Sequence, residues 1–180
     1  LFNPMTGECG EAKVRQVDGK TQVYLQLKSG ESIILQTYRQ PLQASKPWKY
    51  VKEQPFSLRL DHGWKLHFAE SKPEIQGTFD IDRPCSWTNI DHPAAQTNMG
   101  TGVYSLDIEL PALKADNWIL DLGDVRESAR VRINGQEAGC VWAVPYQLKV
   151  GQFLKPGKNH IEIEVTNLPA NRIAELDRQG

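Results

Sequence analysis

Residues Trp118 to Trp142 of this 180-residue chain read W-I-L-D-L-G-D-V-R-E-S-A-R-V-R-I-N-G-Q-E-A-G-C-V-W, and they decide the fold. Asn134 and Gly135 lie between two runs of alternating apolar and polar residues. Asn-Gly is the preferred pair for a two-residue type I′ turn, because both central residues of that turn need a positive φ. The stretch therefore predicts a β-hairpin.

The same turn predicts the register of the hairpin. The expected pairs are Ile133 with Gln136, Arg132 with Glu137, Val131 with Ala138, Arg130 with Gly139 and Ala129 with Cys140. In this register Cys140 and Trp142 share the apolar face of Val131 and Ile133. We therefore expect both side chains to be largely buried, and Arg132 and Glu137 to face each other on the solvent side.

Alternation with a period of two continues through most of the chain. It recurs in residues 23–27, 56–60, 64–68, 104–110 and 161–165, and it is typical of half-buried strands. Gly and Pro fall between these segments, so no helix much longer than two turns fits before residues 173–178, which look helical. The pattern predicts an all-β fold, an antiparallel β-sandwich of jelly-roll type.

The first forty residues form a separate piece. Residues 11–17, 21–28 and 32–39 read as three strands joined by Asp18-Gly19 and Ser29-Gly30 turns. Such a β-meander is too small to bury a core alone and needs a partner surface. We therefore expect a meander over residues 1–40, a linker packed over its surface at 41–55, and a jelly-roll domain over 56–180.

Five short motifs between Phe56 and Gly180 resemble those of a known family. They are G-T-G-V-Y at 100–104, L-D-L-G-D-V at 120–125, V-R-I-N-G at 131–135, P-Y at 145–146 and V-T-N-L-P-A-N-R-I at 165–173. In this order they resemble the galactose-binding-like jelly-roll domain, the sugar-binding domain of family 2 glycoside hydrolases, as found near the C-terminus of family 106-like α-L-rhamnosidases. The resemblance implies a non-catalytic carbohydrate-binding or accessory module, which packs beside the substrate cleft of a glycoside hydrolase and extends it.

The resemblance also implies partners and a location. The partners are carbohydrate and the other domains of a parent glycoside hydrolase, and the location is periplasmic or extracellular, although the chain shows no signal sequence. The meander resembles the end of the β-sandwich that precedes the jelly roll in such enzymes, so the chain is expected to be a piece of a larger enzyme. Calcium is common in these jelly rolls, but no acidic run assigns a site for it. No cofactor is expected.

Composition argues against several other classes of protein. The 21 basic and 22 acidic residues give a formal net charge of −1 and are scattered, so no basic stripe follows a nucleic-acid backbone. No apolar run approaches the length of a membrane span. Cys9, Cys85 and Cys140 are too few and too far apart for a zinc site. A disulfide from Cys85 to either of the others is left open.

No residue is assigned a catalytic role. Carboxylates such as Glu109 and Glu164 alternate with core residues along strands, and a solvated carboxylate lacks the raised pKa that the general acid of a glycosidase needs. Neither a nucleophile elbow nor a His pair with metal-ligand spacing is present. The alternatives to an accessory module are a purely structural interdomain module with no ligand, an autonomous carbohydrate-binding module and, last, an independent glycosidase.

A candidate sugar site lies in the irregular stretch 82–101. Sugar recognition combines an aromatic ring face with polar groups that hold hydroxyls, and long polar loops on a rigid sandwich are where binding sites tend to be built. The candidate carbohydrate-binding residues are Trp87, Asn89, Asp91, His92 and Asn98. The alternative interpretation is that Trp87 plugs one end of the core.

Two other groups of residues favour a structural interpretation. Trp64 and Trp118 lie in phase with neighbouring core positions, which predicts burial. Asn167 and the Asn171-Arg172 pair carry groups suited to sugar hydroxyls or to hydrogen bonds that fix the exit from the last strand, and we favour the second role.

Overall fold

The computed structural model describes residues 1–40, 46–52, 56–112 and 115–180. The chain divides into two units, Leu1–Leu58 and Arg59–Gly180. Of the linker expected at 41–55, residues 41–45 and 53–55 lie outside the described part of the chain. No helix among the described residues is long and apolar enough to cross a membrane.

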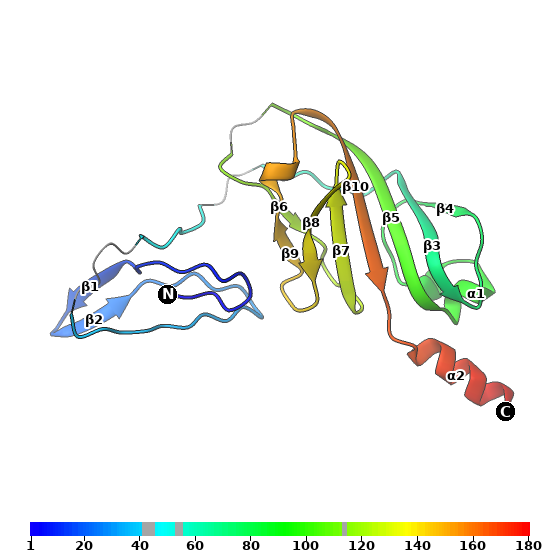
Figure 1. Ribbon diagram of the computed structural model, residues 1–180, viewed down its shortest axis with the longest axis horizontal. Coiled ribbons are helices and arrows are strands. Elements are labelled where there is room, and N and C mark those ends of the chain that lie inside the picture. Colours follow the sequence, from blue (N-terminus) through cyan, green and yellow to red (C-terminus); the bar gives the residue numbers. More distant parts are fainter. Residues whose placement is uncertain (41–45, 53–55, 113–114) are drawn as a thin grey trace. The chain divides into compact units, whose positions relative to one another are not determined.

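The C-terminal unit is built on a six-stranded antiparallel sheet (Figure 1). Its strands, in the order β4-β3-β5-β10-β7-β8, are β4 (Thr78–Ile81), β3 (Trp64–Lys72), β5 (Met99–Leu110), β10 (Gly157–Thr166), β7 (Ser128–Ile133) and β8 (Gln136–Val141). A second, two-stranded sheet pairs β6 (Ile119–Asp121) with β9 (Gln147–Lys149). The expected all-β antiparallel sandwich is confirmed.

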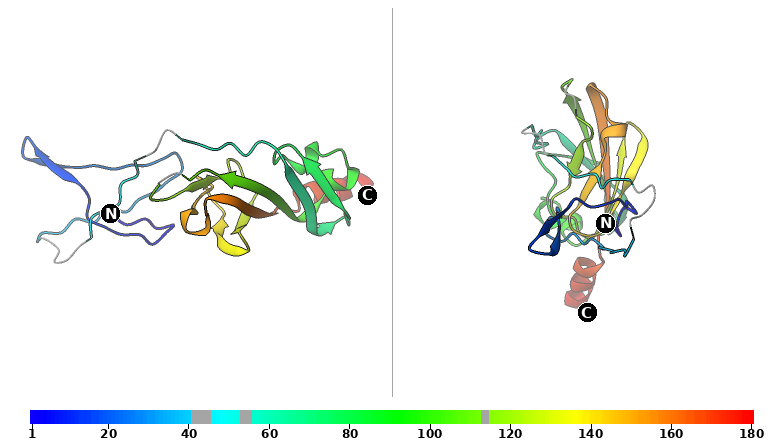
Figure 2. Two further views of the ribbon diagram at one scale, coloured as in Figure 1. Left: turned by 90° about the horizontal axis from the view of Figure 1, so that it is seen from above. Right: turned by 90° about the vertical axis from the view of Figure 1, so that its left-hand side faces the viewer.

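Short helices connect or follow these strands. They are the 3₁₀ turns η1 (Trp87–Asn89) and η2 (Gly151–Phe153), and the α-helices α1 (Pro93–Gln96) and α2 (Ala170–Gln179). Helix α2 contains the segment expected to be helical, and it projects beyond the end of β10 (Figure 2).

The core of this unit follows directly from the alternation in the sequence. Strand pairing aligns Leu66 with Tyr104, Tyr104 with Ile163, and Ile163 with Val131, so four strands contribute one row of side chains. All four are buried. Because fully burying one large apolar side chain contributes about 1.5–3 kcal/mol, such rows hold the sheet against the layer that covers it. Trp64 is buried, as expected, whereas Trp118 is half-buried and packs against the core.

The predicted hairpin forms, but its register changes after two pairs. Ile133 with Gln136 and Arg132 with Glu137 are confirmed, whereas a β-bulge then shifts Val131 from Ala138 to Gly139. The two remaining pairs become Arg130 with Cys140 and Ala129 with Val141.

The expectation that Cys140 and Trp142 are buried was therefore wrong. A shift of one residue turns every following side chain to the other face. Val141 is buried, Cys140 is exposed and Trp142 is 64% exposed. All three cysteines are free thiols in the structure.

Two alternating segments do not form the expected strands. Of residues 23–27, only Val23 lies in a strand, the last residue of β2 (Lys20–Val23), and residues 56–60 are not in a strand. A strand needs a neighbour that accepts and donates its backbone hydrogen bonds, and the described residues supply no ladder to either segment. Alternation alone was therefore an insufficient signal at these places.

The N-terminal unit is the smaller of the two. Its hairpin consists of β1 (Val14–Val17) and β2 (Lys20–Val23), joined at Asp18-Gly19. The strand expected at 32–39 was wrong, because only Ile34 pairs there, in a single bridge with Phe2. Residues 46–52 join the unit instead through a bridge from Pro47 to Glu11.

No described residue of this unit is fully buried, and large apolar side chains such as Met5, Val14 and Tyr38 are exposed. A piece of this size without a core gains little from burial. That the unit is the remnant of another sandwich remains a prediction.

Candidate functional site

Trp87, the aromatic residue of the predicted sugar site, lies inside the C-terminal unit. Its side chain is 7% exposed, and its Nε1 donates a hydrogen bond to the hydroxyl of Tyr104 at 2.8 Å. The edge of its ring meets Phe68, with centroids 5.0 Å apart. Gly102 lies under the ring, where a Cβ atom would come within 2.8 Å of it. Trp87 thus belongs to the buried core, in agreement with the alternative interpretation, and its ring is largely covered by other side chains.

The structure distributes the other four predicted site residues between surface and interior. Asn89 and Asp91 are exposed, whereas Asn98 is 0% exposed and donates from Nδ2 to the carbonyl oxygen of Pro73 at 3.1 Å. His92 is half-buried and its ring packs edge-on against Phe79. They do not share one exposed surface. Sugar binding by this group of residues stays a prediction.

Asn167 has the structural role that we favoured for it. Its Oδ1 accepts the backbone N–H of Gly100 at 3.0 Å, and its Nδ2 donates to the carbonyl oxygen of Asn98 at 2.9 Å. Its own backbone N–H donates to the carbonyl oxygen of Gly100. These bonds join the exit from β10 to the start of β5, and they use both the oxygen and the nitrogen of the Asn167 amide within the fold.

A polar hollow lies on the outer face of the six-stranded sheet, the face that points away from the core. Its volume is about 300 Å³. We call it the sheet groove, and its lining residues are Ala69, Glu70, Thr101, Ser128, Arg130, Cys140, Glu164 and Thr166. Five of the six strands contribute to it, so the groove depends on pairings between segments that are far apart in the sequence.

One row of the sheet groove carries hydroxyl groups. Register places Glu70 beside Thr101, Thr101 beside Thr166, and Thr166 beside Ser128. The two threonine Oγ1 atoms are 2.9 Å apart. Side chains alternate between the faces of a strand, and these residues point outward because their neighbours Gly102 and Ala129 lie on the core side.

The next row carries charges. Glu164 aligns with Arg130, and Arg130 with Cys140. Glu164 Oε1 lies 2.8 Å from Arg132 Nη1, and its Oε2 lies 3.7 Å from Arg130 Nη1. Exposed ion pairs of this kind contribute only about 0–1 kcal/mol to stability. Arg132 lies one row further along, between Glu162 and Glu137, so Glu164 interacts with guanidinium groups of two rows.

The lining of the sheet groove suits recognition of hydroxyl groups. Threonine and serine hydroxyls both donate and accept hydrogen bonds, the guanidinium donates, and the carboxylates accept. None of its described lining residues is aromatic. No three His, Cys, Asp or Glu side chains in the described ranges lie together in a way that would hold a metal ion.

Sequence reasoning did not find the sheet groove. Glu164 was read only as part of a solvated face, and the hydroxyl residues were not singled out. A usable signal was the placement of Thr and Ser, rather than Lys or Glu, at outward positions near the ends of three separate strands. Their contact depends on long-range register, which the sequence did not reveal.

Comparison with known proteins relates the chain to segments of glycoside hydrolases. In sequence, it is 32% identical over 126 residues to a Formosa agariphila protein provisionally named a β-glucuronidase. The match covers 68% of this chain and 11% of that protein. The chain thus spans about a tenth of the length of this curated relative. No family model matches the sequence.

Solved structures share the fold. A rhamnosidase from Novosphingobium sp. PP1Y matches with a TM-score of 0.73 and 23% identity, over 96% of this chain and 16% of the rhamnosidase chain. A β-glucuronidase from an uncultured Clostridium sp. matches with a TM-score of 0.53 and 19% identity, over 66% of this chain and 24% of its own. In both, the matching part is a fraction of a much longer chain.

Proposed function

We propose that this chain is a non-catalytic accessory module of a glycoside hydrolase, of the galactose-binding-like jelly-roll type. One observation carries the proposal. Its sequence match lies within a protein provisionally named a β-glucuronidase, and this chain covers only 11% of that protein. A module of this size inside a larger enzyme would pack against the other domains, beside the substrate cleft. Such an enzyme would work in the periplasm or outside the cell.

We further propose that the module holds carbohydrate in the sheet groove. The hydroxyls of Thr101 and Thr166 and the guanidinium of Arg130 supply donors and acceptors on one surface. A neutral hydrogen bond contributes about 0.5–1.5 kcal/mol net, so three or four such bonds without aromatic stacking support weak binding. We expect a Kd on the order of 1 mM, which corresponds to about 4 kcal/mol.

The runner-up function is a purely structural interdomain module with no ligand. The burial of Trp87 favours it, because the one large ring of the predicted sugar loop is used for the core. The two functions differ in whether the outer face of the sheet binds a saccharide when no other domain is present.

A titration of the 180-residue chain with methyl α-L-rhamnopyranoside separates these functions. Thr166→Val removes a hydroxyl at nearly constant volume, and Arg130→Ala removes the guanidinium. We expect each change to raise the Kd by about fivefold or more, because losing one hydrogen bond costs about 1 kcal/mol of binding free energy. Lys158→Ala is the matched control, because Lys158 is exposed on β10 outside the groove.

The same preparation is assayed with aryl glycosides, and no turnover is expected. Binding that is insensitive to both groove variants refutes the groove as the site. Absence of rhamnoside binding supports the purely structural interdomain module. Turnover that a single Asp or Glu substitution abolishes refutes the non-catalytic role.

A further inference from the structure

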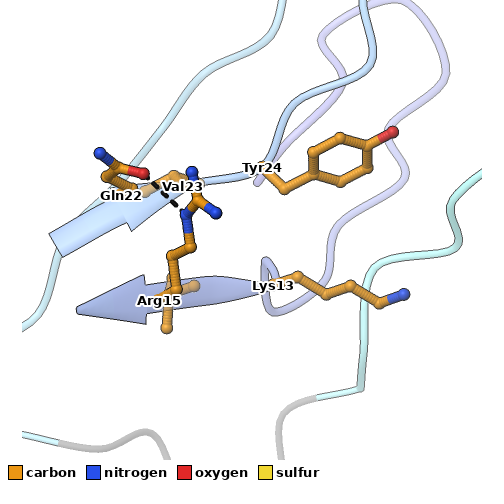
Figure 3. A pocket seen from close by; sticks show the side chains of 6 residues that line it. Lys13, Arg15, Gln22, Val23 and Tyr24 are labelled. Carbon is orange, nitrogen blue, oxygen red and sulfur yellow. Dashed lines mark hydrogen bonds between the residues drawn. The ribbon is translucent and has the colours of Figure 1, made fainter. Parts of the chain in front are cut away.

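A second hollow lies in the N-terminal unit, along the β1-β2 hairpin (Figure 3). Its volume is about 330 Å³, at the lower end of the range for small-molecule sites. We call it the N-terminal hollow, and its lining residues are Lys13, Val14, Arg15, Gln22, Val23 and Tyr24.

The hairpin register brings the functional groups of this hollow to one face. Arg15 pairs with Gln22, and the backbone N–H of Tyr24 donates to the carbonyl oxygen of Lys13 at 2.9 Å. Residues two apart on a strand, and residues directly opposite on its antiparallel partner, share a face. Figure 3 shows the Arg15 side chain reaching toward Gln22, while Lys13 and Tyr24 extend in one direction. Two cations, an amide and a phenol ring therefore line one surface.

Neighbouring groups hold these side chains in place. Arg15 Nε donates to Gln22 Oε1 at 2.7 Å. Tyr50 packs its ring against Tyr24, with centroids 5.0 Å apart, and the ammonium of Lys13 lies 5.2 Å from the centroid of Tyr50. The Tyr50 hydroxyl also accepts the backbone N–H of Lys13 and donates to the carbonyl oxygen of Tyr24. Side chains that are ordered before binding reduce the entropy lost on binding.

The hollow is electropositive. In the described part of the chain, neither Lys13 nor Arg15 has a carboxylate within ion-pair distance. The unit also has eight Lys and Arg residues against five Asp and Glu, a net charge of +3 in a chain whose total is −1. Because Arg15 uses only Nε for Gln22, its two Nη groups stay available for a bidentate contact with a carboxylate.

An apolar surface lies beside these charges. On this face Tyr24 is 52% exposed, whereas Val14 and Val23 pair with each other and point to the opposite face of the hairpin. The ring of a tyrosine suits the C–H face of a pyranose, and the amide of Gln22 suits its hydroxyls. A ligand that matches the whole surface carries one carboxylate, several hydroxyls and one apolar ring face.

We propose that the N-terminal hollow binds an acidic saccharide of the hexuronate class. The carboxylate lies against Arg15 and Lys13, and the sugar ring packs on Tyr24. The inference rests on the proposed function only in that the ligand is a carbohydrate, because the sheet groove and this hollow share no residue. The competing occupant is a segment of protein with acidic and apolar residues. Its acidic groups would contact Arg15 and Lys13, and its apolar residues would contact the exposed apolar side chains elsewhere on the unit.

The test is a titration of the ¹⁵N-labelled 180-residue chain with sodium D-glucuronate, D-glucose and sodium acetate. We expect glucuronate to shift the amide signals of residues 13–15 and 22–24, and to bind about tenfold more tightly than either other probe. Glucose lacks the charge-assisted pair with the carboxylate, and acetate lacks the hydroxyls and the ring face. Arg15→Gln should weaken glucuronate binding by about tenfold, and Tyr24→Leu by about threefold. Lys20→Gln, at an exposed cation outside the hollow, should change it by less than about twofold.

Several results overturn the proposal. Glucose binding as tightly as glucuronate removes the role of the carboxylate, and acetate binding as tightly shows an anion site without sugar recognition. Signals in the hollow that shift only with protein concentration show a protein occupant. If glucuronate fails here while methyl α-L-rhamnopyranoside still binds the sheet groove, only this inference fails. If neither sugar binds anywhere, carbohydrate binding fails as well.

Discussion

Replacing Trp87 by alanine tests how the core of the C-terminal unit is closed. The indole is almost fully buried, and it contacts Phe68, Gly102 and the hydroxyl of Tyr104. A tryptophan that buries about 150–250 Å² contributes about 4–6 kcal/mol at 25 cal/mol per Å². Tyr104 keeps one hydrogen bond, to the carbonyl oxygen of Cys85, so its hydroxyl is not left unpaired. Because such area sums are upper bounds, we expect Trp87→Ala to lower the free energy of unfolding by about 3–5 kcal/mol.

Urea denaturation followed by far-UV circular dichroism measures this loss without depending on tryptophan fluorescence. Trp142→Ala is the matched control, since Trp142 is 64% exposed, and it should change the free energy of unfolding by no more than about 0.5 kcal/mol. A loss below about 1 kcal/mol for Trp87→Ala, or equal losses for the two variants, would refute the core-plug assignment.

Three further predictions concern the same region. Gly102→Ala should cost about 1–3 kcal/mol in urea denaturation, because the new Cβ meets the Trp87 ring at 2.8 Å; unchanged stability would show that the ring lies elsewhere. Burial raises the pKa of Tyr104 from 10.0 to about 12, so the neutral hydroxyl stabilises the fold below pH 10. That contribution to the free energy of unfolding, on the order of 2–3 kcal/mol, should be lost as pH rises from 10 to about 12. A melting temperature that stays constant over this pH range would contradict it. Asn167→Ala should cost about 1–3 kcal/mol and speed hydrogen exchange at Gly100, whose N–H loses its acceptor; an unchanged exchange rate would argue against the Asn167 bonds.

The sequence was most informative where local patterns agree with the final packing. The alternation in residues 64–68, 104–110 and 161–165 correctly identified three central strands, because one face of each is buried against the same core. The Asn134-Gly135 turn and the first two pairs of its hairpin were also predictable, since turn chemistry fixes them locally.

The rest of the hairpin was not predicted, because one additional residue in β8 reverses the faces that follow. An isolated glycine within a strand is a recognised signal of a bulge, and Gly139 was available as that signal. In the same way, a glycine within a strand can indicate the close approach of another group. Gly102 was such a signal, but the sequence alone did not identify the Trp87 ring as the group that packs against it.

The sheet groove was not predicted for a different reason. Thr101, Thr166 and Ser128 come together only because β10 pairs with both β5 and β7. Such register between segments tens of residues apart is set by the packing of the whole sheet, not by local propensity. The N-terminal hollow depends on a local hairpin, but the cations that make it distinctive look like ordinary solvated residues in the sequence.

The central claim is that this chain is a non-catalytic module that holds carbohydrate on the outer face of its six-stranded sheet. Chemical-shift mapping of the ¹⁵N-labelled chain during addition of methyl α-L-rhamnopyranoside tests it most directly. The account predicts saturable shifts at Thr101, Ser128, Arg130, Glu164 and Thr166, with a Kd on the order of 1 mM, and with the rhamnoside recovered intact. Saturable shifts confined to residues 82–98, or no shifts at any rhamnoside concentration up to about tenfold above that Kd, would contradict it.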